Sequence, residues 1–311
     1  MNSNRPNWIL LAISFVITCV TWPLATMLWF THGETAFAVS VYFLGLSLGP
    51  CLAGYALVRK SMKQKLRRMV LFSGGFSIIA LSWFGVMSLD LEGFFMLLMS
   101  GTMGAAIGHT LITVIVGPML FGRFLCGWGC WRAMILELLP VGRGSGRRRG
   151  RWGLLPVVGF GASVGGAALS FFVFGHHPGG TPQSMHGESA IPIAAGFAIY
   201  YVASIGLAFS LRDQRAFCKY LCPNSVILRQ SSRLSLIKMS AKLELCDNCG
   251  ACSRVCPMDI AVARLVQAGR RIASGECILC QRCAHACPKG ALHVTFGLEI
   301  GGTTPFTSAI L

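Results

Sequence analysis

Long apolar runs alternate with short polar segments over the first two thirds of the chain. Six of these runs are long enough to cross the roughly 30 Å hydrocarbon core of a bilayer as a helix. They cover residues 8–30, 35–58, 69–89, 93–121, 152–174 and 191–211. No comparable run follows Arg212, so the pattern predicts six transmembrane helices and then a polar C-terminal part.

The charged residues between these runs indicate an orientation. All 27 lysines and arginines lie before the first run, in segments 59–68 and 122–151, or after Leu211. The loops on the opposite side contain no lysine or arginine and hold four acidic residues, namely Glu34, Asp90, Glu92 and Glu188. Because Lys and Arg accumulate on the cytoplasmic side, we expect both ends of the chain in the cytoplasm, with the helices in a bacterial inner membrane.

Composition agrees with this interpretation. The chain is 54% hydrophobic and 12% charged, with a mean hydropathy of +0.62, which is typical of an integral membrane protein. Its formal net charge of +16 follows from the topology and favours contact with anionic lipid headgroups. Nucleic-acid binding is therefore not expected. A Walker loop and a Rossmann fingerprint are both absent, which argues against nucleotide chemistry.

Eight of the 14 cysteines form two copies of one pattern, C-x2-C-x2-C-x3-C-P, which begin at Cys246 and Cys277. In bacterial ferredoxins three thiolates of such a run hold one 4Fe-4S cluster and the fourth reaches the other cluster. The expected ligand sets are Cys246, Cys249, Cys252 and Cys287 for one cluster, and Cys277, Cys280, Cys283 and Cys256 for the other. Zinc is the alternative, although structural zinc sites usually take two close ligand pairs separated by a longer spacer. Disulfides are not expected in the reducing cytoplasm.

A second repeat lies at the predicted membrane edge. The segment from Arg123 to Cys130 matches the segment from Arg215 to Cys222 in the spacing of one arginine and two cysteines. We call the two C-x3-C pairs, Cys126 with Cys130 and Cys218 with Cys222, the membrane-edge motifs. Together they offer four soft thiolates for a third iron–sulfur or other redox-metal site, a thiol/disulfide relay or transiently bound copper. The alternative is ordinary buried cysteine.

One histidine falls within a predicted span. His109 lies near the middle of the fourth apolar run, and an ionisable group inside a membrane suggests function. It is a candidate to hydrogen-bond a quinone carbonyl or to ligate haem, with a simple interhelical hydrogen bond as the alternative. Outside the membrane, four arginines of the cysteine-rich part suit an acidic partner protein; they are Arg254, Arg270, Arg271 and Arg282.

These motifs together resemble the NapH/MauN family of membrane polyferredoxins, to which the NosR and CcoG types are related. The segments that carry the resemblance are GRFLCGWGC, FCKYLCP and the two ferredoxin runs, within residues 69–291. The resemblance implies an α-helical membrane bundle with a small C-terminal α+β ferredoxin domain. It divides the chain into two N-terminal helices with a basic loop (1–68), a four-helix core (69–240), a two-cluster ferredoxin domain (241–291) and a tail (292–311).

The expected function is electron transfer between a quinol/quinone pool, or a membrane redox partner, and 4Fe-4S clusters on the cytoplasmic side. The chain would then be a subunit of a larger oxidoreductase, of the quinol dehydrogenase type, rather than an enzyme on its own. The resemblance to CcoG-type proteins offers a different class of function, in which the chain reduces copper or assists assembly of a respiratory or periplasmic enzyme. A subunit that only scaffolds a larger complex is the third alternative.

Overall fold

A computed structural model of the chain describes residues 8–32, 42, 45–46, 49–59, 61–83, 91–101, 110–142, 146–148, 150–175, 190–272, 275–300 and 303–309. The chain groups into two compact units. The first comprises Met1–Thr110, Trp128–Leu139 and Phe160–Gly206, and the second comprises Leu111–Gly127, Pro140–Gly159 and Leu207–Leu311. His109 lies outside the described residues, so its role as a quinone or haem contact stays a prediction.

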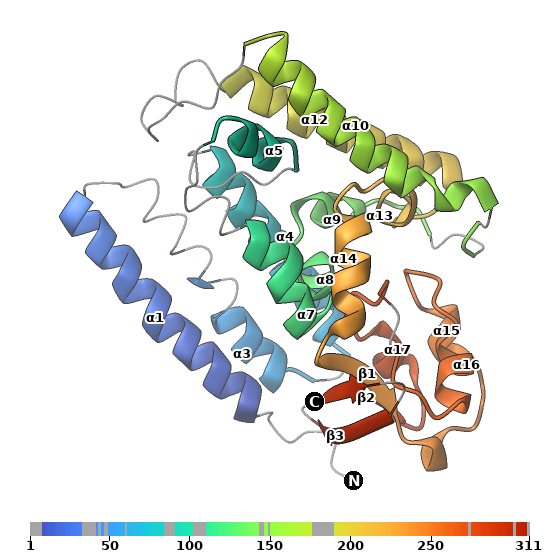
Figure 1. Cartoon of the computed structure of the whole chain (residues 1–311). Coiled ribbons are helices and arrows are strands. Elements are labelled where there is room, and N and C mark those ends of the chain that lie inside the picture. The colour runs from blue at the N-terminus through green and yellow to red at the C-terminus, as the bar shows by residue number, and fades with distance from the viewer. Residues whose placement is uncertain are drawn as a thin grey trace. The chain divides into compact units, whose positions relative to one another are not determined.

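Helices dominate the first unit (Figure 1). It contains α1 (Trp8–His32), α3 (Pro50–Leu57), α4 (Lys63–Trp83), α5 (Leu91–Met99) and α9 (Trp131–Leu136). It also holds most of two long helices, α10 (Leu155–Phe172) and α12 (Ala190–Leu211). The first, third, fifth and sixth apolar runs thus coincide largely with α1, α4, α10 and α12.

Two helices within the described part of the chain are long and apolar enough to cross a membrane. They are α10 and residues 194–211 of α12, and only 17% and 11% of these stretches are buried inside the protein. A third is reached if the broken pair Thr113–Phe121 and Phe124–Leu136 counts as one span. Apolar helices with so little burial favour a lipid environment over water. The six-span bundle itself stays a prediction.

Small residues let α4 pack closely on α9. A Cβ atom added at Gly75 would lie 3.0 Å from the Cα of Trp131, and one at Gly74 would lie 3.2 Å from the Cα of Gly129. A buried ion pair lies beside this contact, because Arg67 on α4 donates to Glu137 just after α9 at 2.6 Å. Close helix contacts through glycine are typical of membrane bundles.

A polar cluster in the same unit links α5, α10 and α12. The carboxylate of Glu92 on α5 accepts hydrogen bonds from the hydroxyls of Ser163 on α10 and Tyr200 on α12, both at 2.6 Å. The guanidinium of Arg132 lies 3.9 Å from the ring centroid of Tyr200. The hydrophobic pattern places Glu92 in a loop between two predicted spans, and it carries no signal for this contact between three helices.

The second unit is built on a small antiparallel sheet. Strands β1 (Ile237–Ala241), β2 (Leu292–Ile300) and β3 (Thr303–Ala309) lie in the order β1-β2-β3. Between β1 and β2 the chain forms the short helices α15 (Ala251–Arg254), α16 (Val262–Gln267) and α17 (Arg282–Ala286). The cysteine-rich loops are therefore tied at both ends by the pairing of β1 with β2.

Buried Arg271 reinforces this sheet from within. Its side chain is 4% exposed and donates to the hydroxyl of Thr295 and to the carbonyls of Leu236, Thr295 and Gly297 at 2.9–3.0 Å. These bonds satisfy the guanidinium internally, as burial of a charge requires. Arg271 is therefore not part of a surface for an acidic partner, contrary to the expectation from the sequence.

Candidate functional site

The two cysteine runs fold into loops of the same conformation. Equivalent positions in the two copies share the left-handed backbone region, with φ between 50° and 69°. These pairs are Asn248 with Leu279, Gly250 with Gln281, and Asp259 with Gly290. Few non-glycine residues adopt this region, and it costs free energy when they do. Both copies bear this cost, which indicates that the loop shape itself is required.

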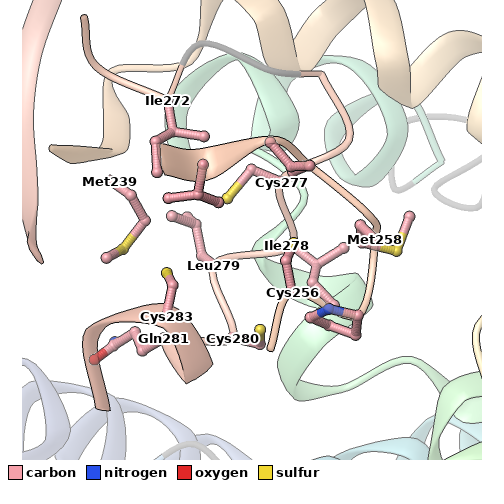
Figure 2. Close-up of a pocket in the computed structure, with 13 residues that line it drawn as sticks. Met239, Cys256, Met258, Ile272, Cys277, Ile278, Leu279, Cys280, Gln281 and Cys283 are labelled. Carbon is pink, nitrogen blue, oxygen red and sulfur yellow. The ribbon is translucent and has the colours of Figure 1, made fainter. Parts of the chain in front are cut away.

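The second loop and the last cysteine of the first loop enclose one cavity (Figure 2). Its cysteines are Cys256, Cys277, Cys280 and Cys283. Apolar side chains such as Met239, Ile272 and Leu279 surround these thiols. We call this group of four cysteines the inner site.

The first loop and the last cysteine of the second loop enclose another cavity. Its cysteines are Cys246, Cys249, Cys252 and Cys287. Polar residues of the loop, Asp247 and Asn248, share its lining. We call this group the outer site. The structure thus brings together the two crossed sets of cysteines that the spacing predicts.

The donor set of each cavity fits a 4Fe-4S cluster. A cluster is held by four thiolates around a cube, whereas a zinc ion needs its sulfurs about 2.3 Å from a single centre. Four cysteines line each cavity, which matches the number of thiolates that a 4Fe-4S cluster takes.

Burial favours the protonated form of three of the inner thiols when no metal replaces the proton. It raises the pKa of Cys277 to about 12, and it also raises the pKa of Cys256 and Cys283. Backbone N–H groups oppose this effect, from Leu279 at Cys277 and from Ile260 and Met258 at Cys256. Amides aimed at sulfur stabilise the thiolate form, and such hydrogen bonds help to set the potential of a bound cluster.

Three of the four membrane-edge cysteines belong to the second unit. The positive charge of Arg123 acts on Cys126, Cys218 and Cys222 together, so the two motifs come close to one guanidinium. Arg215 connects them as well, because it donates to the carbonyl of Cys126 at 3.0 Å and to the sulfur of Cys218 at 4.0 Å. Cys130 belongs to the first unit. A four-cysteine centre therefore stays a prediction.

Glu276 lies at the centre of a buried ion network next to the inner site. It precedes Cys277, is 8% exposed, and accepts a hydrogen bond from Arg123 at 2.8 Å. Its other oxygen forms ion pairs with Arg147 at 3.0 Å and Arg229 at 2.6 Å. One carboxylate thus balances three guanidinium groups from distant parts of the sequence.

Lys219 lies inside the second membrane-edge motif and forms a second buried ion network. Its side chain is fully buried, and its ammonium group lies 2.5 Å from a carboxylate oxygen of both Asp213 and Asp259. Asp259 follows Cys256 by three residues. The sequence predicts Arg123 as part of the repeated membrane-edge spacing and Lys219 only as a topological charge, and neither ion pair has a local sequence signal.

Two family models match the chain. The model described as a 4Fe-4S dicluster domain matches residues 238–288, which contain all eight cysteines of the inner and outer sites. The model described as a 4Fe-4S binding domain matches twice, at residues 104–151 and 195–241. Each of these two segments contains one membrane-edge motif.

Known proteins with similar sequences are named for electron transport or as ferredoxins. The "Putative electron transport protein YccM" of Escherichia coli K12 is 28% identical over 61% of this chain, which spans 55% of that protein's own length. The "Methylamine utilization ferredoxin-type protein MauN" of Methylorubrum extorquens is 27% identical over 64% of the chain and 71% of its own length. MauN of Paracoccus denitrificans is 34% identical over 31% of the chain and 35% of its own length. No solved structure matches the chain.

The repeated cysteine loops, their two cavities and the dicluster match define an iron–sulfur electron-transfer protein of the ferredoxin type. Together with the relatives, these features support a MauN/NapH-type polyferredoxin family for the chain.

Proposed function

We propose that this protein is an integral membrane electron carrier that passes electrons between a quinol/quinone pool, or a membrane redox partner, and two 4Fe-4S clusters in the cytoplasm. The inner and outer sites each hold one cluster through their four cysteines. Six spans place both ends of the chain in the cytoplasm of a bacterial cell. Partner subunits supply any substrate chemistry.

The observation that carries this proposal is the crossed arrangement of thiols in two cavities. Each cavity takes three cysteines from one run and the fourth from the other run, which is the ligand pattern of two-cluster ferredoxins. The largely exposed apolar helices α10 and α12 support attachment to a membrane. The 4Fe-4S binding match at each membrane-edge motif supports a third iron–sulfur centre at Cys126, Cys130, Cys218 and Cys222.

The protein's own residues shape these sites. Bound clusters would supply one-electron redox chemistry. Apolar side chains such as Met258 and Leu279 exclude water from the inner site, while the amide of Ala291 donates to the sulfur of Cys287 at 3.3 Å in the outer site. Exclusion of water and hydrogen bonds to sulfur both set the potential at which an electron is accepted.

Anaerobic purification in detergent tests the cofactor proposal. We expect about eight iron atoms per chain for the two sites, four for each cluster, and EPR signals of reduced 4Fe-4S clusters after dithionite treatment. Folded protein that binds zinc but no iron, and that gives no EPR signal, would contradict the proposal.

Proteoliposomes test the electron donor. A short-chain quinol should reduce the EPR-active clusters of the wild-type protein, and Cys126→Ser should slow this reduction. If Cys126→Ser instead abolishes reduction of Cu(II) and leaves the quinol reaction intact, the CcoG-like copper function is favoured. Reporter fusions after residues 68, 90 and 211 test the topology, with the reporter expected outside the cytoplasm only after residue 90.

A further inference from the structure

The first membrane-edge motif touches the loop of the inner site through its backbone. Gly127 follows Cys126, and a Cβ atom added to it would lie 2.2 Å from the carbonyl oxygen of Ile278. Ile278 lies between Cys277 and Cys280, two of the four inner cysteines. Because only glycine permits this approach, the motif and the inner loop are in direct contact.

Arg123 strengthens the same contact with charge. Besides its hydrogen bond to Glu276, it lies 3.5 Å from the carbonyl oxygen of Gly275, at the start of the inner loop. The charge of Arg123 acts on Cys277 of the inner site as well as on Cys126, Cys218 and Cys222. One buried guanidinium therefore lies within electrostatic range of both groups of cysteines.

The second membrane-edge motif also contacts the inner site. Lys219 lies between Cys218 and Cys222, and its ion pair with Asp259 ties this motif to the turn after Cys256. Cys256 is the inner-site cysteine that comes from the first run. Both motifs are thus joined to loops that carry inner cysteines, through three separate contacts.

The outer site has a different environment. Cys249 is exposed to solvent, as are Asp247 and Asn248 beside it. By contrast, Cys256 and Cys280 of the inner site are buried at 8% and 7% exposure. The two sites are therefore unequal, although their sequence patterns are the same.

We infer that the inner site is the one that exchanges electrons with the membrane-edge motifs, and that the outer site exchanges electrons with a soluble redox carrier. This order rests on the proposed function. Each transfer between the two sites moves one electron: one site is oxidised as the other is reduced, and no covalent bond changes. A quinol oxidised in the membrane supplies two electrons and releases two protons, which provides one electron for each site.

Paramagnetic broadening tests the order without any quinol. Dithionite-reduced wild-type protein should show two EPR contributions, and Cys249→Ser identifies the outer one by its loss. Soluble chromium(III) oxalate should relax the outer contribution several-fold more strongly than the inner one. Equal relaxation of both, or stronger relaxation of the inner one, would overturn the inferred order.

Quinol-driven reduction tests the contact through Gly127. In Gly127→Ala the loop must shift, so we expect reduction of both clusters to slow at least tenfold, while dithionite still reduces both. The matched control is Gly161→Ala, whose added Cβ has no atom within 4 Å, and it should behave as wild type. Unchanged reduction in Gly127→Ala would contradict the inference.

Single-site variants distinguish a failure of the inferred order from a failure of the proposed function. Quinol should still reduce the inner cluster of Cys249→Ser, whereas the outer cluster of Cys283→Ser should stay oxidised. Reduction of the outer cluster in Cys283→Ser at the wild-type rate would overturn the order alone. If quinol reduces neither cluster in wild-type protein but dithionite reduces both, the quinol part of the proposed function fails, and the broadening experiment still decides the order.

Discussion

The guanidinium of Arg123 donates to the carboxylate of Glu276 at 2.8 Å across 153 residues of sequence. Arg123 begins the first membrane-edge motif and Glu276 immediately precedes the inner loop. Their hydrogen bond therefore couples the two cysteine-bearing segments physically. Removal of either partner should affect both stability and the inner site.

Glu276→Gln should destabilise the protein more than any single substitution of its arginine partners. It leaves three guanidinium groups without their carboxylate, and breaking a buried pair typically costs about 3–5 kcal/mol. The pKa of Arg229 is already lowered by burial and by its arginine neighbours, while Glu276 opposes this shift. Thermal unfolding in detergent measures the loss of stability in Glu276→Gln.

Two controls accompany Glu276→Gln. Arg147 has a side chain that is 29% exposed, so Arg147→Gln should cost about 1 kcal/mol or less. Glu244 is exposed, and Glu244→Gln should leave the melting temperature unchanged. A smaller loss in Glu276→Gln than in Arg147→Gln would show that the buried network contributes little.

Lys219→Met should destabilise the second unit by about 3–5 kcal/mol, because it leaves the carboxylates of Asp213 and Asp259 buried without a cation. Chemical denaturation of the detergent-solubilised protein provides the measurement. A second change, Asp259→Asn, should recover part of the loss in Lys219→Met. The surface control Lys242→Met should stay within about 0.5 kcal/mol of wild type, and an equal loss there would contradict this role of Lys219.

The sequence could predict which cysteines share a site, because short spacings decide which thiols converge. Three thiols within one tight loop must converge, and the fourth belongs to the neighbouring loop in every two-cluster ferredoxin pattern. Cys256 lines the same cavity as Cys277, and Cys287 lines the same cavity as Cys246. The spacing pattern and the two cavities therefore group the cysteines in the same way.

The difference between the two sites could not be predicted in this way. It depends on long-range contacts, such as Gly127 with Ile278 and Lys219 with Asp259, for which the sequence carries no periodic signal. A count of lysines and arginines also cannot distinguish a residue that only sets the membrane orientation from one whose charge is buried in the protein. Arg271, for example, is an internal support of the sheet rather than a surface charge.

Loading of the inner site with iron and sulfide should depend on pH in cluster-free protein. Burial raises the pKa of Cys277 to about 12, so this thiol is protonated at neutral pH and loses its proton when metal binds. Each proton displaced makes the affinity rise tenfold per pH unit below the pKa. We expect loading to increase as pH rises through the neutral range, as measured by iron content and proton release. Loading that does not change with pH would contradict this expectation.

Tyr200→Phe should destabilise the first unit by about 1–3 kcal/mol. It removes one of the two hydroxyls that donate to Glu92, and a partly buried carboxylate then loses a charge-assisted hydrogen bond. Tyr201→Phe is a matched control on the same helix, since Tyr201 donates to the neutral carbonyl of Trp131 at 2.9 Å, and it should cost about 1 kcal/mol. Thermal unfolding of both variants in detergent compares them, and a larger loss in Tyr201→Phe would contradict the role of Glu92.

The left-handed backbone at Gln281 predicts opposite effects for two substitutions. Gln281 follows Cys280 with φ of 57°, a conformation that glycine adopts freely and β-branched residues resist. Gln281→Gly should therefore retain the inner-site EPR signal and gain up to about 1 kcal/mol in stability. Gln281→Val should lose at least about 1 kcal/mol and release its iron sooner on mild heating. The control is Gln230→Val at an exposed helical position, where we expect a loss of stability no larger than the small difference in helix propensity. If Gln281→Val retained iron as well as Gln281→Gly, the backbone conformation would not be what the inner loop requires.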